Sequence, residues 1–458
     1  MSLATDPLLA PLPSSLPAVE RLARMPVGFA AAAATAGIKA SGNPDLALVV
    51  ASDGPVPAAA VTTPNRFAAA PVRLSRANLS ATGGTSAAAG YARAVISTSG
   101  SANAATGPDG DADQVAIGEA VAAALGCAPV EVLHLSTGVI GTRVPVDKVR
   151  TAVVRVAGGE LAATDVALEA AAVALRTTDS TTKVATASVD VPAAGGGTVT
   201  VTVSGIAKGV GMIHPRMATM LSVLVTDASA DPATLRALLA GAAARTWNQL
   251  SVDGDTSTND SVFVLASGAA SAADPGDDPA ARAALAAAIE AVARDLARQQ
   301  AADGEGATAL ITCQVSGAAD DADARAIARA VVASQLVKAA VHGRDPNWGR
   351  VAGAAGNAVT AEAATLEAAG LSPADAAART GRPAAVDPAR MRIAIAGHLV
   401  YDGAAGGPLP IDKAAVRASM AGDEVLIRVD VGLGEGIGEA FGCDLTEGYV
   451  KENSEYTT

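Results

Sequence analysis

Aromatic residues are scarce in this chain of 458 residues. Phe 4, Tyr 4 and Trp 2 make up 2% of the sequence, although 50% of it is apolar. Basic residues are outnumbered as well, because 33 Lys and Arg against 46 Asp and Glu give a net charge of −13. A nucleic-acid partner requires a cationic surface and favours stacking rings, so these two shortages exclude that class. The composition instead indicates a soluble globular protein with a core of small aliphatic side chains.

Cysteine is also rare. Cys127, Cys313 and Cys443 lie far apart and have neither CxxC nor metal-ligand spacing, which favours a reducing, cytoplasmic location. The mildly apolar run 26–37 begins too late for a signal peptide. No uncharged, strongly apolar stretch of about 18 residues predicts a membrane span. The first ~20 residues, which are rich in proline, are expected to form a loose lead-in.

The sequence has no complete metal or cofactor motif. Its four histidines form no HExxH pattern, and no GxxxxGK[ST] phosphate loop occurs. Residues 253–264 resemble a calcium loop but have Thr258 at the sixth position and Val264 at the twelfth, so a polar turn is favoured. The glycine-rich run 432–438 lacks the third glycine of a dinucleotide fingerprint, and close backbone packing between strands is its preferred interpretation. Neither a metal nor a bound cofactor is therefore expected.

Short β-rich runs alternate with Ala-rich helical runs, which is typical of an α/β or α+β fold. Residues 184–191 and 198–206, joined by the glycine-rich loop 193–197, predict an antiparallel hairpin. The segment 267–277 fits either a surface loop or a domain boundary. The other expected strands are 46–51, 94–97, 131–135, 221–225, 391–396 and 424–431, and the expected helices are 115–125, 164–176, 232–247, 280–299 and 322–335.

Residues 205–222 combine Lys208, two close glycines, His214 and three of the seven methionines around the pair Ala218-Thr219. A glycine loop feeding a strand would explain part of this pattern. However, a Thr at a strand start, after a small residue and a flexible loop, also suits self-cleavage. Its hydroxyl would attack the preceding carbonyl, and the freed amine could then serve as the base for that hydroxyl.

This segment resembles the self-cleavage motif of the glutamate N-acetyltransferase/ornithine acetyltransferase family of arginine biosynthesis, the ArgJ family. The resemblance extends from about Gly28 to Thr458. Further matching blocks are Gly37-Ile-Lys-Ala-Ser-Gly, Thr63-Pro-Asn-Arg-Phe, Ser99-Gly-Ser-Ala-Asn-Ala, Ser136-Thr-Gly-Val-Ile-Gly, Thr177-Thr-Asp, Asp255-Thr-Ser-Thr-Asn-Asp, Asp303-Gly-Glu-Gly-Ala, His342-Gly-Arg-Asp-Pro-Asn-Trp-Gly-Arg and Asn453-Ser-Glu-Tyr-Thr-Thr.

The resemblance implies autocatalytic cleavage between Ala218 and Thr219, giving an α chain of residues 1–218 and a β chain of residues 219–458. Thr219 would take acetyl from N2-acetyl-L-ornithine, release ornithine and pass the acetyl to L-glutamate in a ping-pong reaction. Acetyl-CoA as an additional donor stays open. Alternatives are an aminopeptidase or amidase of the same cleaved fold, an ornithine acetyltransferase of secondary metabolism, or a silent amino-acid-binding protein that retains the fold.

Family membership also implies a set of site residues. The resemblance implies Thr219 as the nucleophile and Thr137 and Gly138 as the oxyanion hole, whereas the alternative for these two is a purely structural turn. The implied substrate contacts are Thr177, which is favoured over Thr178, and Lys208, Thr219, Glu305, Asn453 and Thr458. His214 is interpreted as a packing or loop residue, and the block Asp345–Arg350 is left unassigned between the pocket and a structural turn.

The implied fold is a layered α/β sandwich with stacked sheets and flanking helices, similar to N-terminal-nucleophile hydrolases but differently connected. The family also implies an α₂β₂ heterotetramer. Ser101, Ala105 and Arg216 depart from residues common in the family, which affects only the expected fine specificity.

Overall fold

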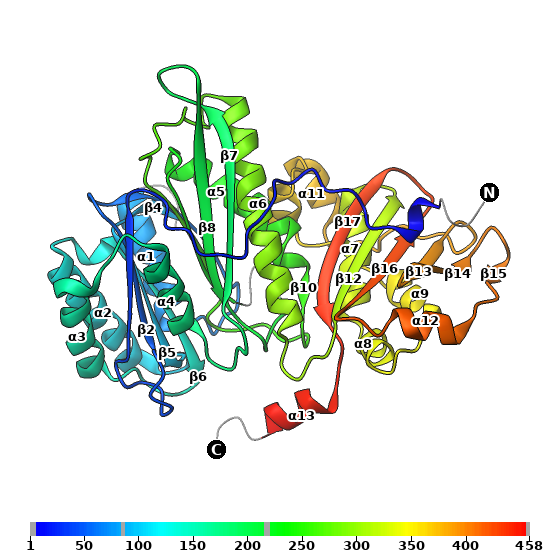
Figure 1. Ribbon diagram of the computed structural model, residues 1–458, viewed down its shortest axis with the longest axis horizontal. Helices are drawn as coiled ribbons and strands as arrows, with labels where there is room; N and C mark the ends of the chain where they lie inside the picture. Colours follow the sequence, from blue (N-terminus) through cyan, green and yellow to red (C-terminus); the bar gives the residue numbers. More distant parts are fainter. Residues whose placement is uncertain (1–5, 84–87, 215–219, 455–458) are drawn as a thin grey trace.

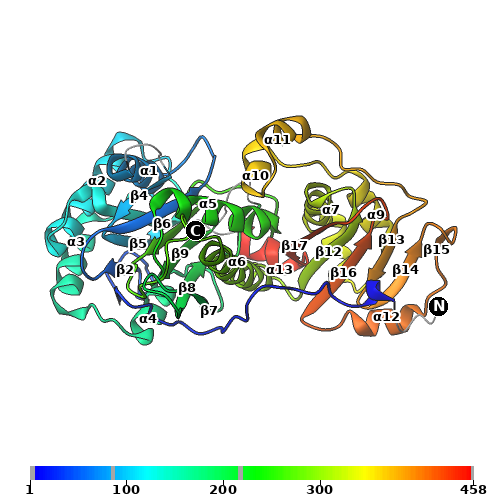
Figure 2. The ribbon, with the colours of Figure 1, turned by 90° about the horizontal axis from the view of Figure 1, so that it is seen from above.

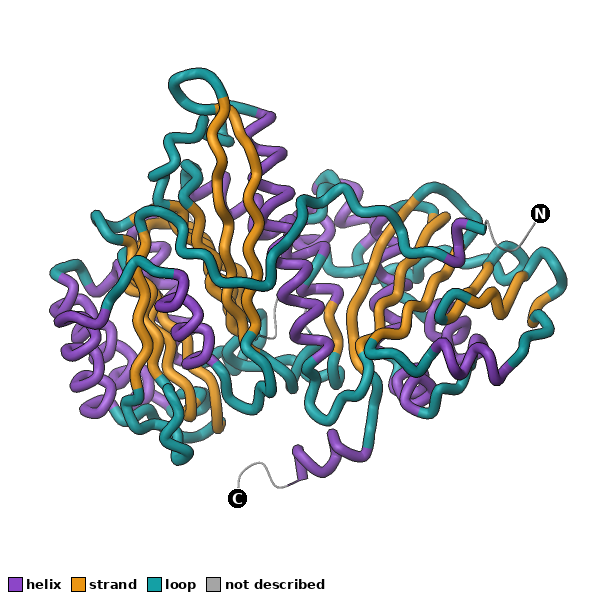
Figure 3. The backbone as a smooth tube through the Cα atoms, in the orientation of Figure 1, coloured by secondary structure: helices purple, strands orange, loops and turns teal. Residues whose placement is uncertain are grey.

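The computed structural model describes residues 6–83, 88–214 and 220–454. Sheets and layers of helices alternate along its longest axis (Figure 1), and Figure 3 separates the two kinds of element by colour. The first sheet has the order β1-β2-β5-β6, in which only the β5/β6 pair is parallel. Its strands are β1 (Phe29–Ala34), β2 (Leu46–Ala51), β5 (Ala94–Ser101) and β6 (Val132–Val139), and its outer face packs against α2 (Gly107–Leu125) and α3 (Val146–Arg155).

The second sheet has the order β4-β3-β11-β9-β8-β7. Two helices, α1 (Ala70–Gly83) and α4 (Asp165–Leu175), contribute to a buried apolar cluster that includes residues of both sheets. On the other face lie α5 (Pro232–Arg245) and α6 (Pro279–Ala302). The strands are β3 (Val56–Thr62), β4 (Ala89–Ala92), β7 (Lys183–Pro192), β8 (Thr198–Lys208), β9 (Leu221–Thr226) and β11 (Ser261–Ala266).

The third sheet has the order β10-β17-β12-β16-β13-β14-β15. Its core is shared with α7 (Asp321–Ala333) and α9 (Trp348–Gly356), while α6 links β17 to the second sheet. The strands are β10 (Leu250–Ser251), β12 (Leu310–Ala318), β13 (Arg392–Ile395), β14 (His398–Asp402), β15 (Gly407–Pro408), β16 (Glu424–Asp430) and β17 (Gly436–Cys443). The other helices are α8 (Gln335–His342), α10 (Ala363–Ala368), α11 (Pro373–Arg379), α12 (Lys413–Ser419) and α13 (Glu447–Ser454), with 3-10 turns at Pro7–Leu9, Pro129–Glu131 and Trp247–Gln249 and a π turn at Val156–Glu160.

Small side chains allow these layers to approach closely. A Cβ added at Gly205 on β8 would lie 2.8 Å from both Val292 and Leu296 of α6. Larger residues there would separate the helix from the sheet, at a cost in packing. The glycine at position 205 thus lets α6 lie directly on β8. The helix itself begins at a carboxylate cap, because Asp278 accepts the N–H groups of Ala280 and Ala281.

The layered α/β architecture predicted from the sequence is confirmed, as are the hairpin of β7 and β8 and the helices after residues 231 and 279. Strands β5 and β6 run four residues beyond their expected ends. The segment 267–277 is a loop between β11 and α6, so it is not a boundary between spatial units. No helix in the described ranges combines the length and apolarity required to cross a bilayer.

The expectation of a loose N-terminal lead-in is wrong for the described residues from Asp6 onward. Figures 1 and 2 show this segment lying along the third sheet. Leu8 is buried there, the Leu12 N–H donates to Gln314 at 2.7 Å, and the Arg428 guanidinium donates to the carbonyls of Pro7 and Ala10. Proline-rich composition disfavours helix and strand, but it does not prevent an extended segment from packing.

Candidate active site

A pocket of about 290 Å³ lies where β6 and β8 end, close to the loop after α4. It collects the predicted residues Thr137, Gly138, Thr177, Lys208, Glu305 and Asn453, which are widely separated in the sequence. Ala218, Thr219 and Thr458 lie outside the described residues. The rest of its wall consists of Ala102, Val139, Ile140, Thr178, Gly211, Met212, Ser257, Thr258 and Asn259.

Gly138 cannot be replaced without moving the neighbouring strand. Its φ is +127°, a conformation that disfavours side chains, and an added Cβ would lie 2.4 Å from the carbonyl carbon of Gly100 on β5. The β5/β6 register shifts at the same level, next to Ser101. This bulge lets the end of β6 turn into the pocket wall and places Thr137 and Gly138 side by side there.

Lys208 ends β8 and donates its ammonium to the hydroxyl of Thr137 at 2.9 Å. Because an ammonium group only donates, the Thr137 hydroxyl accepts here and its own hydrogen is free to point at another acceptor. Burial lowers the pKa of Lys208, whereas the Asp179 carboxylate opposes that change. Lys208 and Thr137 therefore provide a cation and a hydroxyl donor that are directly hydrogen-bonded to each other.

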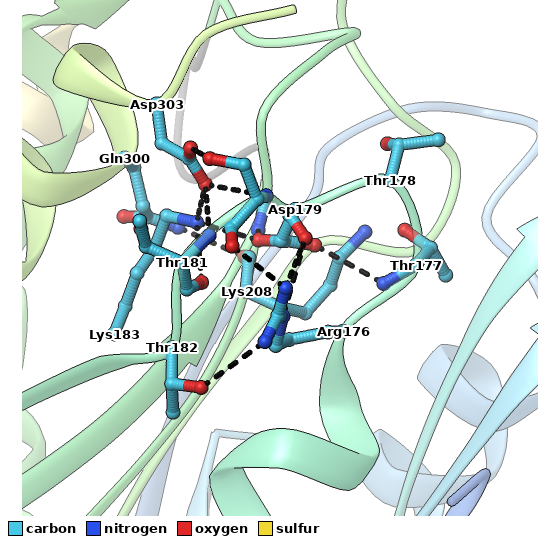
Figure 4. A network of polar contacts seen from close by, with 12 residues as sticks. Arg176, Thr177, Thr178, Asp179, Thr181, Thr182, Lys183, Lys208, Gln300 and Asp303 are labelled. Carbon is cyan, nitrogen blue, oxygen red and sulfur yellow. Dashed lines mark hydrogen bonds and ion pairs between the residues drawn. The ribbon is translucent and has the colours of Figure 1, made fainter. Parts of the chain in front are cut away.

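Asp179 is the charged centre of a buried network (Figure 4). Its carboxylate accepts from the Lys183 ammonium at 2.7 Å, the Gly209 N–H at 2.7 Å and the Thr177 N–H at 3.1 Å. Burial opposes ionisation of Asp179, but Lys208, Lys183 and the Gly209 N–H outweigh it and lower its pKa to about 2. One carboxylate thus fixes both the loop that carries Thr177 and the backbone that follows Lys208.

The same network fixes the Asp303–Glu305 loop. Lys183 forms a second ion pair with Asp303 at 2.6 Å, and Asp303 accepts the N–H groups of Ser180 and Thr181 at 3.1 and 3.2 Å. Glu305 follows two residues later, and its own N–H donates to the Val210 carbonyl at 2.8 Å. Lys183 is fully buried and pairs with both Asp179 and Asp303. It therefore holds the loop of Asp179 and the loop of Asp303 in a fixed relative position.

Glu305 faces two donors across the pocket. Its carboxylate accepts the Thr178 hydroxyl and the Asn453 amide, each at 2.9 Å. Asn453 of the C-terminal segment thus lies at the pocket beside this carboxylate, and its expected contact with substrate stays a prediction. Thr177 and Thr178 both line the pocket, but only Thr178 bonds Glu305 through its side chain, whereas Thr177 binds Asp179 through its backbone.

Sequence analysis did not single out Asp179, Lys183 or Asn259 as individual site residues. The Asn259 amide donates to the carbonyls of Ala102 and Ser136 at 2.6 and 2.8 Å, which holds the end of β6 in place. Asp179 and Asn259 each lie inside a block that carried the family resemblance. Their position inside these blocks was the one sequence feature that could have identified Asp179 and Asn259. Their roles depend on contacts with distant strands, which the sequence does not show.

Three other motifs receive structural roles. Asp253 of the failed calcium loop accepts the N–H of Ile213 at 2.8 Å and so shapes the loop beside the pocket. His214 lies 3.0 Å from the Ser251 hydroxyl, in agreement with its interpretation as a loop residue. Trp348 of the unassigned block stacks on Tyr401 with ring centroids 4.8 Å apart and packs against the third sheet, away from the pocket.

The glycine-rich run 432–438 permits close backbone approach to both strand β12 and helix α7. A Cβ at Gly436 would lie 2.2 Å from Asp320, and one at Gly438 would lie 2.6 Å from the Arg325 nitrogen at α7. The interpretation as close packing between strands is confirmed, because a Cβ at Gly434 would lie 2.6 Å from the Ala318 carbonyl of β12, and the start of α7 is a further close partner.

A lysine, a glutamate, an amide, hydroxyl groups and a glycine backbone thus surround a small space. A carboxylate pairs with the cation, and an amine with the glutamate. This layered fold and its pocket define an α/β protein with a site for small molecules.

Comparison with known proteins specifies the family. The model of the ArgJ family matches residues 30–458, and the chain belongs to that family. It is 45% identical to the arginine biosynthesis bifunctional protein ArgJ of Thermosynechococcus vestitus over 94% of this chain and 96% of the relative. The protein of the same name from Thermus thermophilus is 44% identical, with 95% and 99% covered.

Two solved structures are also similar. The arginine biosynthesis bifunctional protein ArgJ from Bacillus halodurans is 36% identical, with a TM-score of 0.44, over 52% of this chain and 99% of that chain. The ornithine acetyltransferase from Mycobacterium tuberculosis, solved with ornithine, is 40% identical with a TM-score of 0.38 over 43% and 97%.

Proposed function

We propose that this protein is a self-processing acetyltransferase of arginine biosynthesis that moves acetyl from N2-acetyl-L-ornithine to L-glutamate. The observation that carries the proposal is the convergence of Thr137, Gly138, Lys208, Glu305 and Asn453 on one pocket in a member of the ArgJ family. Each of these groups can bind a charged group of an amino-acid substrate or stabilise the oxyanion that forms during acyl transfer.

Processing would cut the chain between Ala218 and Thr219. The Thr219 hydroxyl attacks the Ala218 carbonyl, the acyl group shifts from nitrogen to oxygen, and water hydrolyses the ester to leave a free Thr219 amine. On the far side of this junction, Leu221 pairs with Lys208 in the β8/β9 ladder. The new chain therefore enters the sheet directly beside the pocket lysine.

In the transfer reaction the Thr219 amine removes the hydroxyl proton, and the oxygen attacks the acetyl carbonyl of N-acetylornithine. The developing oxyanion accepts from the Thr137 hydroxyl and the Gly138 N–H, since Lys208 occupies a lone pair of Thr137 and directs its hydrogen outward. Collapse breaks the amide bond, and protonated ornithine leaves. The amine of glutamate then attacks the acetyl ester in the same way and restores the Thr219 hydroxyl.

Lys208 would bind the substrate carboxylate, and Glu305, with Thr178 and Asn453 beside it, would bind the amine of the ornithine side chain. We include Thr177 and Thr458 as further substrate contacts. Neither a metal nor a bound cofactor takes part in this reaction, and acetyl-CoA is a candidate second donor. We propose cytoplasmic activity as an α₂β₂ assembly of the two cleaved chains.

A gel of the purified protein and an acetyl-transfer assay test this function. We expect two bands in place of one near 45 kDa, with the second chain beginning Thr-Met-Leu-Ser. Thr219→Ala should abolish both processing and transfer, whereas Lys208→Ala should reduce transfer while leaving the overall fold intact. An uncleaved, active wild-type chain would refute the proposal.

The alternative amidase is separated from the transferase by its acceptor. With N-acetylornithine and glutamate present, we expect N-acetylglutamate to exceed free acetate. Acetate as the main product, unchanged by glutamate, would favour the hydrolase. Omission of N-acetylornithine and addition of acetyl-CoA tests the second donor in the same assay. Rescue of an arginine-requiring strain would distinguish the primary pathway from a role in secondary metabolism.

A further inference from the structure

Helix α13 carries Asn453 to the pocket, yet its own packing does not hold it in place. Figure 1 shows this helix extending from the end of β17, away from the sheets. It has eight residues, and none of them is buried. Helices shorter than about 12–15 residues are marginal in water without tertiary packing. The position of Asn453 therefore depends on how the segment that precedes α13 is anchored.

The segment between β17 and α13 is bound to the loop that contains Glu305. The buried Asp444 carboxylate accepts the Thr308 N–H at 2.7 Å. The Thr446 hydroxyl donates to the Gly306 carbonyl at 2.6 Å. The start of α13 is therefore fixed relative to the Glu305 loop.

Helix α8 binds the same segment through two side chains that lie one helical turn apart. The buried Lys338 ammonium donates to the Cys443 carbonyl at 2.8 Å. His342 places Nδ1 3.1 Å from the Asp444 carboxylate and Nε2 3.4 Å from Glu447, which lies in the first turn of α13. Because a carboxylate only accepts, Nδ1 is the donor to Asp444. His342 thus contacts both the anchoring segment and the helix that follows it.

We propose that His342 is a positioning residue for substrate binding. Through Asp444 and Glu447 it sets the direction in which α13 leaves the third sheet. That direction fixes the place where Asn453 meets Glu305 at the pocket. This role rests on the proposed acetyl transfer for its kinetic effect, but not for its structural effect.

The two contacts of His342 differ in strength. The Asp444 side chain has no exposed surface, whereas the Glu447 side chain is 94% exposed. An exposed ion pair contributes little, and loss of a partner from a buried carboxylate costs more. The Asp444 contact should therefore contribute most of the effect. His342 is also the first residue of the block 342–350, which thereby receives a role at the pocket in addition to its packing role.

Kinetics of two variants of similar shape test the proposal. The amide nitrogen of His342→Asn takes the place of Nδ1 and keeps the donor to Asp444, whereas that of His342→Gln takes the place of Nε2 and loses this donor. We expect KM for N-acetylornithine to rise several-fold in His342→Gln and to stay within about twofold of wild type in His342→Asn, with kcat little changed in both. Arg344→Gln, at an exposed position two residues farther along, is the matched control. A wild-type KM in His342→Gln would overturn the proposal.

A double-mutant comparison separates positioning from a general structural effect. If His342 acts through Asn453, His342→Gln raises KM in the wild-type chain and adds little in an Asn453→Ala background. The same fold-increase in both backgrounds would overturn the route through Asn453.

Limited proteolysis tests the same role without acetyl transfer. Trypsin cleavage after the exposed Lys451 requires local opening of α13. We expect faster release of the peptide that follows Lys451 in His342→Gln and release at the wild-type rate in His342→Asn. A wild type that transfers no acetyl would refute the proposed function, and the cleavage rates would still decide the role of His342.

If His342→Gln fails to fold, Glu447→Ala removes the second contact from the side of the helix and should speed the same cleavage to a smaller extent. Unchanged cleavage in every folded variant of these two positions would overturn the proposal.

Discussion

The Thr137 hydroxyl receives a hydrogen bond from Lys208 and faces the candidate active site. Replacement by valine preserves the shape of the side chain and removes the donor. We expect kcat for acetyl transfer to fall about 100-fold, as for other single oxyanion donors, with little change in KM. Steady-state kinetics check this, and Thr142→Val, on an exposed part of the loop that follows β6, is the control. Equal loss in both variants would contradict the assignment.

Asp179 gives the site a pH-dependent stability. Its pKa is about 2, below the ordinary value, so its stabilising effect is present above about pH 4 and is lost as the pH falls toward 2. Asp179→Asn leaves the buried Lys183 with one carboxylate fewer, and we expect destabilisation of about 3 kcal/mol or more at neutral pH.

Urea unfolding of wild type and Asp179→Asn from pH 7 to pH 2 measures this difference. It should be constant down to about pH 4 and shrink below it, because protonated Asp179 no longer differs in charge from asparagine. Asp53→Asn, at an exposed position, serves as the control. A difference that stays constant across the whole range would contradict the ionised state of Asp179.

At the scale of elements, the bulge between β5 and β6 depends on Gly138. Alanine there would combine a positive φ with a clash at Gly100, so we expect a loss of about 1–3 kcal/mol and a displaced oxyanion site. Thermal unfolding and kcat should both fall. Gly158→Ala, where an added Cβ meets nothing within 4 Å, should leave both unchanged.

Helix α13 supplies a pocket residue and packs little. Within Glu447–Ser454 no residue is buried, yet Asn453 reaches Glu305 at 2.9 Å. Asn453→Ala should raise KM for N-acetylornithine several-fold and leave the melting temperature unchanged, since the lost contact lies at a solvated rim. The neighbouring Glu452→Ala is the matched control, and a fall in melting temperature in Asn453→Ala alone would contradict this view.

Local patterns predicted the elements well and their ends less well. Leu46–Ala51 is a continuous apolar run, and β2 occupies the same residues. By contrast, β6 continues past Leu135 through Ser136, Thr137 and Gly138, which read as a turn because they are polar or small. They belong to the strand because β5 pairs with them, and a pairing between distant segments leaves no local pattern.

The site was predicted through family resemblance more than through chemistry of the sequence itself. Lys208 and Glu305 were identified by matching blocks, and the structure brings both to the pocket. Lys183 was missed because it looks like any strand-start lysine. Its role is visible only in the folded protein, where it pairs with Asp303, a residue 120 positions away in the sequence. Ion pairs of this kind depend on tertiary placement, which composition and spacing do not encode.

At the scale of the whole molecule, the two proposed cleavage products both contribute strands to the second sheet. In that sheet β11 and β9 of the second product lie between β3 and β8 of the first, since β3 pairs with β11 and β8 with β9. We therefore expect the cleaved chains to co-elute in gel filtration at neutral pH and to separate only in denaturant. A strong-salt wash is the control, since backbone hydrogen bonds and apolar burial resist it. Separation under that wash would contradict the interlocked arrangement.

The packed N-terminal segment adds a kinetic consequence. Residues from Asp6 onward bind the third sheet, and the same chain supplies four strands of the second sheet. The first cleavage product therefore contacts the second product at two distant places. Once the peptide bond is cut, recovery from denaturant becomes an encounter between two molecules, and its rate depends on concentration. The uncut precursor refolds within one molecule. If cleavage follows folding, the two chains are assembled only once, while they are still one molecule. Unfolding of the cleaved protein is then hard to reverse in dilute solution.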